Sequence, residues 1–383
     1  MIWANIVLGL TTLFLLVYAI LIFSYRKWFL QLAVFKPASA TYTTTFTIII
    51  PARNEEDNIK DCVTAILEQE YPKTLFEVIV VDDHSTDATA QIVTGLQEQY
   101  ANLKLIKLAD VLQGKLLNAY KKKAIDTAIA QSSGDWIMTT DADCTMGRNW
   151  ISSYAAYIEQ YDPAFVAAAV IFKNTGSFIS IFQCLDFISL QGITAASVSA
   201  GFHSMCNGAN LAYKKEAFHA VGGFKGIDNI ASGDDMLLMH KIKKQFPGKI
   251  GYLFTQSAIV STLPMPDWKS FLNQRIRWAS KADKYNDKGI IAVLACVYML
   301  NFFLLFFPLL GFICTHYLLY WLGLLCIKTI VEMTFMIPAA QFFGQQRLMW
   351  WFPVMQPFHI AYTVAAGWLG KFGSYKWKER KVL

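Results

Sequence analysis

Residues 78–87, VIVVDDHSTD, place a short run of β-branched side chains directly before a loop of acidic and hydroxyl side chains. An apolar run that ends at polar residues in this way is typical of a buried strand. Asp87 is a suitable residue to begin a helix, and the spacing of Ile92, Val93 and Leu96 predicts one. The stretch therefore predicts a strand, a polar loop and a helix in succession.

The same succession recurs along the chain. Residues 46–50, 103–108 and 136–140 are further predicted strands, and helices are predicted after the loop at 52–58 and around 121–130. Strands that alternate with helices indicate the α/β class, with a Rossmann-like, mostly parallel sheet covered by helices on both faces.

Three of the predicted strands end in strongly polar loops. These loops contain Arg53 and Glu55, the pair Asp82-Asp83, and the pair Asp141 and Asp143. In sheets of this kind, ligands bind at the carboxyl ends of the strands. We therefore expect a binding site where the three loops converge.

The two ends of the chain are more apolar than its middle. The protein is 55% hydrophobic and 16% charged, its mean hydropathy is +0.34, and residues 1–24 carry no charge. A helix needs about 20 apolar residues to cross a bilayer core. Residues 290–315, 316–344 and 349–370 are further candidates. We expect one N-terminal and two or three C-terminal transmembrane helices.

These runs divide the chain into five expected parts. They are a transmembrane helix at 1–25, a cytoplasmic globular domain at 36–265, an amphipathic interfacial helix at 266–288, a transmembrane region at 289–370 and a basic tail at 371–383.

The basic residues beside the apolar runs indicate the orientation in the membrane. Arg26 and Lys27 follow the first run and favour a cytoplasmic globular domain, because Lys and Arg concentrate on that side. The tail carries five basic residues against one acidic residue and favours the same side, whereas three crossings after the domain would place it outside. Either the last, proline-containing segment does not cross the membrane, or the basic residues of the tail do not determine the side on which it lies.

Polar residues within the apolar segments are expected to be paired or packed. Lys328 and Glu332 are four residues apart and share a helix face, so mutual neutralisation is the simpler explanation. Residues 178–200 are interrupted by Gln183, Asp186 and Gln191 and are too polar for a span. We expect them to pack between the sheet and the membrane.

The composition argues against other kinds of site. The seven cysteines are odd in number and show no C-x-x-C spacing, which favours free thiols over a disulfide framework or a zinc site. The net charge of +6 comes without a basic stripe carrying interleaved aromatic residues, so no nucleic-acid partner is expected.

Two acidic pairs have both a catalytic and a structural interpretation. Asp141 and Asp143 flank a small residue, and both carboxylates can face a hard cation such as Mg²⁺, or they can simply end a strand. Asp234 and Asp235 begin a predicted helix, where acidic residues complement the helix dipole or supply a general base.

Residues 274–278, QRIRW, precede the second apolar run. A helix lying in the membrane interface is one interpretation, and arginines that neutralise a leaving diphosphate are the other. Gln274, Arg277 and Trp278 are three and four residues apart, so they share one face of a helix. An interfacial helix would not require these three in particular.

In their order along the chain, these motifs resemble the membrane-anchored family-2 glycosyltransferases. The likeness covers residues 47–278 and the membrane pattern, and the ordered set is much more specific than any single motif. The matching motifs are Ile50-Pro51-Ala52-Arg53-Asn54-Glu55, Val81-Asp82-Asp83-His84-Ser85-Thr86-Asp87, Lys121-Lys122-Lys123-Ala124-Ile125, Thr140-Asp141-Ala142-Asp143-Cys144, Asn207-Gly208-Ala209-Asn210, Gly222-Gly223-Phe224, Gly233-Asp234-Asp235 and Gln274-Arg275-Ile276-Arg277-Trp278.

The resemblance implies an A-type glycosyltransferase fold, a nucleotide-sugar donor and inversion at the anomeric carbon. It implies that Asp141 and Asp143 hold Mg²⁺ or Mn²⁺ on the donor diphosphate, and that Asp235 is the base, with Asp234 beside it. The donor-binding residues that it implies are Ala52, Arg53, Glu55, Asp82, Asp83, Lys121, Asp141, Gln274, Arg277 and Trp278.

The chain departs from the family pattern at three positions. His84 replaces a common glycine, which leaves the nucleoside contact open. Tyr120 replaces the usual glycine before Lys121, so that Gly114-Lys115 is a rival alignment, and Asp234 stands where the family more often has Glu.

The expected partners are a nucleotide-sugar, a lipid or glycan acceptor, and the membrane, with the bacterial inner membrane as the expected location. The small number of membrane segments favours transfer to a lipid over a processive polysaccharide synthase. A metal-dependent nucleotidyltransferase would share the acidic loops but would not explain residues 274–278. A non-catalytic membrane scaffold would have no reason to keep Asp141, Asp143 and Asp235 together.

Overall fold

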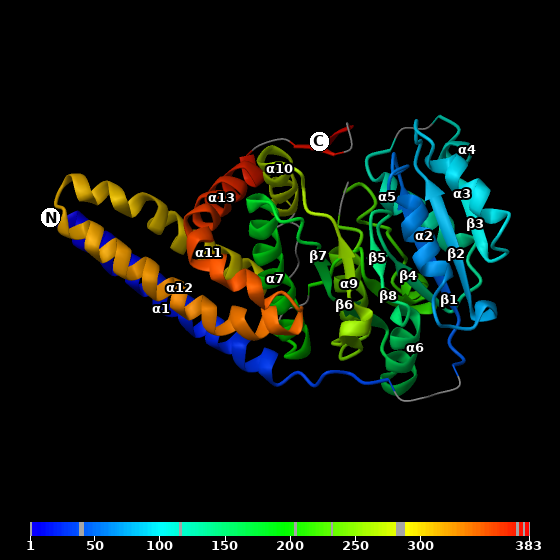
Figure 1. The fold of residues 1–383 in the computed structure, drawn as a ribbon, viewed down its shortest axis with the longest axis horizontal. Helices are drawn as coiled ribbons and strands as arrows, with labels where there is room; N and C mark the ends of the chain where they lie inside the picture. The colour runs from blue at the N-terminus through cyan, green and yellow to red at the C-terminus, as the bar shows by residue number, and fades with distance from the viewer. Residues whose placement is uncertain are drawn as a thin grey trace.

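The computed structural model describes residues 2–37, 42–114, 117–202, 205–230, 233–280, 288–372, 375–377 and 380–382. Its two parts lie side by side: a helical part built from both ends of the chain, and an α/β part built from the middle (Figure 1). Lys115, of the rival alignment, lies outside the described residues.

A seven-stranded sheet forms the centre of the α/β part, in the order β3-β2-β1-β4-β8-β6-β9. Strand β8 is antiparallel to both of its neighbours and the other pairings are parallel, which confirms the mostly parallel sheet. The strands are β1 (Phe46–Ala52), β2 (Phe76–Asp82), β3 (Leu103–Lys107), β4 (Trp136–Thr139), β6 (Phe165–Ala168), β8 (Leu211–Lys214) and β9 (Ile250–Leu253).

The interior of this sheet is apolar because its strands consist of the apolar runs that the sequence showed. Strand β2 is buried along its whole length, and Ile48, Ile49 and Ile50 of β1 are fully buried. The helices of this part are α2 (Ile59–Leu67), α3 (Thr89–Gln97), α4 (Leu108–Leu112), α5 (Tyr120–Ala130), α6 (Trp150–Tyr161), α8 (Lys215–Ala220) and α9 (Met236–Gln245), with 3₁₀ turns η1 (Lys73–Leu75) and η2 (Gln256–Ala258).

A second, three-stranded sheet connects the α/β part to the helical part. It has the order β5-β10-β7, formed by β5 (Thr145–Met146), β10 (Val260–Thr262) and β7 (Val170–Phe172). Helix α7 (Phe178–Ser199) follows β7 and helix α10 (Trp268–Ala279) follows β10. Both helices therefore leave the same small sheet and enter the helical part together.

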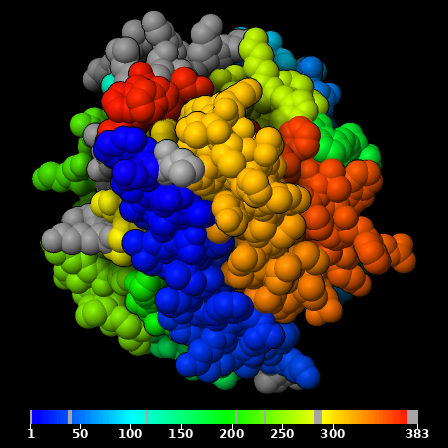
Figure 2. All heavy atoms as spheres, turned by 90° about the vertical axis from the view of Figure 1, so that its left-hand side faces the viewer, coloured from blue at the N-terminus to red at the C-terminus, as the bar shows by residue number. Residues whose placement is uncertain are grey.

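The helical part contains α1 (Ile2–Leu30), α11 (Lys288–Phe306), α12 (His316–Phe342) and α13 (Phe352–Phe372), with 3₁₀ turns η4 (Phe307–Phe312) and η5 (Gln346–Trp351). Helix α1 lies against the C-terminal helices although it comes from the other end of the chain (Figure 2). Four helices are long and apolar enough to cross a membrane: Ile2–Leu30, Phe178–Ser199, Gly289–Phe312 and His316–Phe342.

Helix α7 differs from the other three candidates in its burial. Of its most apolar stretch, 72% is buried inside the protein, against 22% for α1, 28% for the α11 segment and 39% for α12. The expectation that this segment is too polar for a span is wrong, since its length and hydropathy would allow it to cross. As expected, however, it packs inside the protein, between the small sheet and helices α1, α11 and α12 (Figure 1), which we call the membrane-type helices. The three more exposed helices are the better candidates for contact with lipid.

The last apolar segment, 349–370, does not belong to this group. It forms η5 and α13, which carries Gln356, His359 and an internal proline, Pro357. Helix α13 turns back toward α10 (Figure 1), and a Cβ on Gly370 would come within 2.7 Å of the Cβ of Ala279. Its C-terminal end therefore lies beside the C-terminal end of α10.

The expected interfacial helix and basic tail are only partly described. Helix α10 ends at Ala279, and residues 281–287 of the expected helix lie outside the described residues. In the tail, Tyr375–Trp377 and Arg380–Val382 form two short antiparallel strands, β11 and β12.

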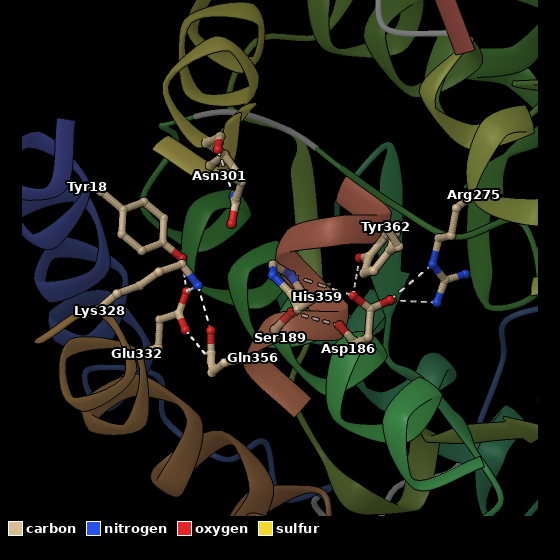
Figure 3. Close-up of polar contacts among 11 residues, drawn as sticks. Tyr18, Asp186, Ser189, Arg275, Asn301, Lys328, Glu332, Gln356, His359 and Tyr362 are labelled. Atoms are coloured by element: carbon tan, nitrogen blue, oxygen red, sulfur yellow. Dashed lines mark hydrogen bonds and ion pairs between the residues drawn. The ribbon is translucent and has the colours of Figure 1, made fainter. Parts of the chain in front are cut away.

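The two charges of α12 neutralise each other inside the bundle. The Nζ atom of Lys328 donates to the carboxylate of Glu332 at 2.6 Å and to Gln356 at 2.7 Å. Glu332 also accepts from the hydroxyl of Tyr18 on α1 at 2.6 Å. The expected pairing is confirmed, and it additionally ties α12 to α1 and α13 (Figure 3).

Candidate active site

The loops that follow β1 and β2 hold each other in place. Arg53 donates from Nη1 to the backbone oxygens of Asp83 at 2.8 Å and His84 at 3.2 Å. The amide of Asn54 donates to Ser85 Oγ at 3.0 Å, and the amide of Asp83 donates to the oxygen of Ala52 at 2.8 Å. The side chain of Arg53 is thus directed at the neighbouring loop, which it braces.

The backbone of His84 explains the glycine that the family commonly has there. Its φ is +57°, in the left-handed region that favours glycine. Its Nδ1 lies 2.9 Å from Asp83 Oδ1, so the imidazole contacts the second aspartate of the pair. The first, Asp82, is buried and accepts from the amide of Ser85 at 3.3 Å, which gives it a turn-forming contact.

The pair Asp141 and Asp143 lies directly beyond β4. Asp143 accepts from Thr262 Oγ1 of β10 at 3.0 Å, so the small sheet positions this carboxylate. Burial raises the pKa of Asp143, and repulsion from Asp141 and Glu55 raises it further. Three carboxylates crowded together in a half-buried place are stabilised by a cation.

The oxygen ligands here suit Mg²⁺ or Mn²⁺. Among the described residues, no group of three His, Cys, Asp or Glu side chains forms a metal cage. Mg²⁺ needs no such cage, because it is usually held by one or two carboxylates together with water and substrate phosphates. Asp141 and Asp143 therefore fit a metal that arrives with a diphosphate.

Lys121 of α5 joins this region to the start of α9. Its Nζ lies 2.7 Å from Asp141 Oδ1 and 3.4 Å from Asp234 Oδ2. Burial lowers the pKa of Lys121, but the carboxylates of Asp141 and Asp234 more than offset it, so the pKa lies above its ordinary value. Lys121 is thus a permanent positive charge at the centre of the site.

Asp234 and Asp235 reach this centre from the opposite side. Asp235 begins α9 by accepting from the amide of Met236 at 2.7 Å, and its other oxygen accepts from the amide of Gly208 at 3.0 Å. A Cβ on Gly208 would lie 3.3 Å from Asp234 Oδ2 and 3.4 Å from Lys121 Nζ. The glycine of the Asn207–Asn210 motif therefore allows the backbone to approach the charged groups.

Helix α10 supplies the third side of the site. Asp267 caps its first turn by accepting from the amide of Ser270 at 2.9 Å. Gln274, Arg277 and Trp278 all face the same cavity as the acidic pairs. The shared face that their spacing predicted is therefore turned toward the site.

Arg275, by contrast, does not belong to the membrane surface, where the amphipathic interpretation placed it. Its side chain is 4% exposed, and Nε and Nη2 donate to Asp186 Oδ2 of α7 at 3.0 and 2.6 Å. Its Nη1 donates to Gln274 Oε1 at 2.6 Å, and its guanidinium lies 4.3 Å from the ring centroid of Trp278. Arg275 thus orients two of the candidate site residues.

Asp186 is the residue that the sequence analysis underestimated. Besides Arg275, it accepts from the hydroxyl of Tyr362 on α13, so one carboxylate ties α7, α10 and α13 together (Figure 3). The signal was present in the sequence, since an acidic residue inside an apolar helix requires a partner. The partner lies 89 residues away and could not be identified from spacing.

These elements surround one cavity of about 1180 Å³. All of the predicted site residues except Asp82 line it: Ala52, Arg53, Glu55, Asp83, Lys121, Asp141, Asp143, Asp234, Asp235, Gln274, Arg277 and Trp278. Its far wall is apolar and comes from the helical part, with Ile290, Leu294 and Val297 of α11 and Ala366 and Gly367 of α13.

Comparison with known protein families agrees with this architecture. Residues 47–222 match the model for glycosyl transferase family 2, and residues 136–369 match the model for glycosyl transferase family group 2. Together the two matches cover both the α/β part and the C-terminal helices. The chain belongs to the family-2 glycosyltransferases.

The sequence identity to individual relatives is low. The chain is 26% identical over 279 residues to the Bacillus subtilis protein "Probable glycosyltransferase YdaM", covering 72% of this chain and 63% of the relative. It is 31% identical over 123 residues to the beta-monoglucosyldiacylglycerol synthase of Synechocystis, covering 32% of this chain and 24% of that protein. The chain thus spans less than two thirds of either relative.

A solved structure shares the fold over nearly the whole chain. The mannosyltransferase PcManGT from Pyrobaculum calidifontis, in complex with GDP-Man and Mn²⁺, aligns over 96% of this chain and 97% of its own, with a TM-score of 0.61 and 18% identity. The expected A-type glycosyltransferase fold, with an N-terminal and further apolar helices, is confirmed.

The ion pair of Arg275 predicts a difference between the two arginines of α10. Removing one partner of a buried ion pair costs about 3–5 kcal/mol, because the other charge is left uncompensated. Arg275→Ala should therefore strongly lower the thermal unfolding midpoint in detergent, and Arg275→Lys should lower it in part, since one ammonium cannot replace the forked contacts. Arg277→Lys, on a half-buried side chain, should lower it less than Arg275→Lys does.

Arg277→Lys is the matched control, because it makes the same chemical change two residues away on a half-buried side chain. Equal midpoints for Arg275→Lys and Arg277→Lys would contradict the structural role of Arg275.

Proposed function

We propose that this glycosyltransferase is a metal-dependent, inverting enzyme of the membrane, which moves a sugar from a nucleotide-sugar to a lipid acceptor. The observation that carries the proposal is the cavity of about 1180 Å³, which has the acidic pairs on one wall and the apolar residues of α11 and α13 on the other. A polar donor and an apolar acceptor would meet there.

The donor is assigned to the polar wall. Ala52, Arg53, Glu55 and Asp83 would lie beside the nucleoside, and Lys121 would lie on the phosphate side. The binding of GDP-Man and Mn²⁺ by the mannosyltransferase with the same fold supports a nucleotide-sugar donor of this general kind. A guanidinium forks well onto phosphate oxygens, which suits Arg277 for the diphosphate.

Asp141 and Asp143 are the residues that would hold Mg²⁺ or Mn²⁺. When bound, the metal would neutralise charge on the leaving diphosphate. Lys121 already contacts Asp141, so the ammonium and the two carboxylates would together orient the diphosphate. Trp278 would offer a flat apolar wall to the sugar ring or to the acceptor.

Transfer itself is a single displacement at the anomeric carbon. Asp235 takes the proton of the acceptor hydroxyl while its oxygen forms the new bond to that carbon. The bond to the diphosphate oxygen breaks on the opposite face, and the nucleoside diphosphate leaves with the electron pair. Attack opposite the leaving group inverts the configuration.

A processive polysaccharide synthase is the second candidate. The helical part favours a lipid acceptor, since only α1, α11 and α12 combine membrane-type length with an exposed surface among the described helices. Relatives of both kinds exist: the beta-monoglucosyldiacylglycerol synthase of Synechocystis supports a lipid acceptor, and the poly-beta-1,6-N-acetyl-D-glucosamine synthase of Staphylococcus epidermidis supports the second candidate. Family membership disfavours a nucleotidyltransferase.

The location proposed is the bacterial inner membrane, with the catalytic domain in the cytoplasm. If α1, α11 and α12 cross and α13 does not, the basic tail lies on the same side as Arg26 and Lys27. The charge rule and the number of crossings then agree.

The metal assignment predicts that Asp143→Ala abolishes turnover. It should also remove the part of the nucleoside diphosphate affinity that depends on Mn²⁺, because one of two protein ligands is lost. Calorimetric titration of the diphosphate with Mn²⁺ and with EDTA measures this part, and Thr262→Val, which removes only the hydrogen bond to Asp143, is the milder control. Unchanged Mn²⁺-dependent binding to Asp143→Ala would refute the assignment.

The base assignment predicts that Asp235→Asn transfers sugar about 10²–10⁴ times more slowly. Donor affinity should remain normal, since the base acts on the acceptor. Asp234→Asn, one residue away, is the matched control and should weaken the donor complex through Lys121. If Asp234→Asn instead slows transfer more than Asp235→Asn at equal donor affinity, Asp234 is the base.

A further inference from the structure

A second cavity, of about 180 Å³, lies inside the helical part. Helices α1, α7, α11, α12 and α13 all contribute to its wall, and most of the wall is aliphatic or aromatic. The apolar lining residues include Leu21, Ile22, Leu185, Ile193, Val293, Phe335, Met336, Phe352 and Met355. Water would find few hydrogen-bond partners in such a space.

This inner cavity adjoins the catalytic cavity. The two share eight lining residues, so they have a common boundary: Asp186, Ser189, Leu190, Met205, Ile290, Leu294, Val297 and His359. The space is therefore arranged as a polar chamber beside the acidic pairs, a boundary, and an apolar chamber among the membrane-type helices.

Three polar residues lie at the boundary: Asp186, Ser189 and His359. Asp186 is engaged by Arg275 and Tyr362, and the hydroxyl of Ser189 donates to the backbone oxygen of Asp186 at 2.7 Å. The ring of His359 lies beside them, with Nε2 3.9 Å from Asp186 Oδ1 (Figure 3). Its Nδ1 is buried and has no hydrogen-bond partner among the described residues.

At the end of the inner cavity away from Asp186, the polar lining groups are already paired with one another (Figure 3). Tyr18, Glu332 and Gln356 line it there, and all three are already joined to one another or to Lys328 by hydrogen bonds of 2.6–2.7 Å. These groups therefore have few hydrogen-bonding positions left for a further polar ligand. An occupant must therefore be apolar along most of its length.

We propose that the inner cavity binds the hydrocarbon chain of the lipid acceptor, with the polar linkage of the lipid beside His359 and its hydroxyl in the catalytic cavity. The assignment rests on the proposed acceptor class and specifies where such a lipid lies. Continuity with the catalytic cavity is the reason for choosing the acceptor over a lipid that only fills space. Burial of the chain removes its apolar surface from water, which stabilises the complex.

A lateral route into this site lies along α11. Leu294 lines both cavities and is 43% exposed, and Ile291, which lines the catalytic cavity, is 46% exposed. Because α11 is one of the helices long and apolar enough to cross a membrane, the proposal places this opening toward the bilayer. A lipid can therefore enter from the bilayer without passing through water.

The test uses the full-length protein in vesicles of phosphatidylcholine and phosphatidylglycerol that contain a phospholipid with a diazirine on one acyl chain. After illumination, mass spectrometry identifies the labelled residues. Met336 and Met355 face the inner cavity and are 2% and 3% exposed, whereas Ile330 and Ile337 of α12 are exposed on the outside. We expect label on the two methionines as well as on the outer residues.

Val297→Trp should block the boundary and remove the label from Met336 and Met355, while the label on Ile330 and Ile337 remains. Leu305→Trp is the matched control, because it adds the same side chain to a partly buried position of α11 that lines neither cavity. It should keep the label on both methionines.

Label confined to outward-facing residues in the wild-type protein would overturn the proposal, and so would equal labelling of the methionines in Val297→Trp. Transfer of radioactive sugar from nucleotide-sugars to the vesicle lipids is measured in parallel. Labelled methionines without any transfer would support the lipid site and refute the proposed acceptor. Transfer without labelled methionines would refute the site alone.

Discussion

The ammonium group of Lys121 joins the two sides of the candidate site. It lies between Asp141, at the end of β4, and Asp234, at the start of α9, and these carboxylates come from positions 93 residues apart. Without a positive charge between them, the acidic groups would repel one another in a half-buried place. The neighbouring Asp235 is oriented by the backbone amides of Gly208 and Met236.

The second constraint is the connection of this site to the membrane-type helices. Helices α7 and α10 leave the same small sheet, and the Asp186–Arg275 pair holds them against each other and against α13. As a result, Gln274 and Trp278 are positioned by a buried ion pair, and a change in the packing of the helical part would reach the catalytic cavity. The candidate site lies at the junction of the two parts of the molecule.

The local patterns predicted the architecture well, because each depends on neighbouring residues. The apolar runs at 46–50 and 78–81 became β1 and β2, and the polar loops behind them met at one edge. Long-range contacts were not predictable in the same way. Spacing could not show that Arg275 pairs with Asp186, nor that α13 folds back onto α10 through Gly370, because both depend on the packing of helices distant in sequence.

The central claim is that the acidic edge of the sheet binds a nucleotide-sugar through a divalent metal and activates it for transfer. The most direct measurement is the release of nucleoside diphosphate by the wild-type protein from a panel of nucleotide-sugars, in membranes, with Mn²⁺ and with EDTA. The account predicts release from at least one member of the panel, with Mn²⁺ only. Equal release with EDTA, or binding of no nucleotide-sugar with Mn²⁺, would contradict it.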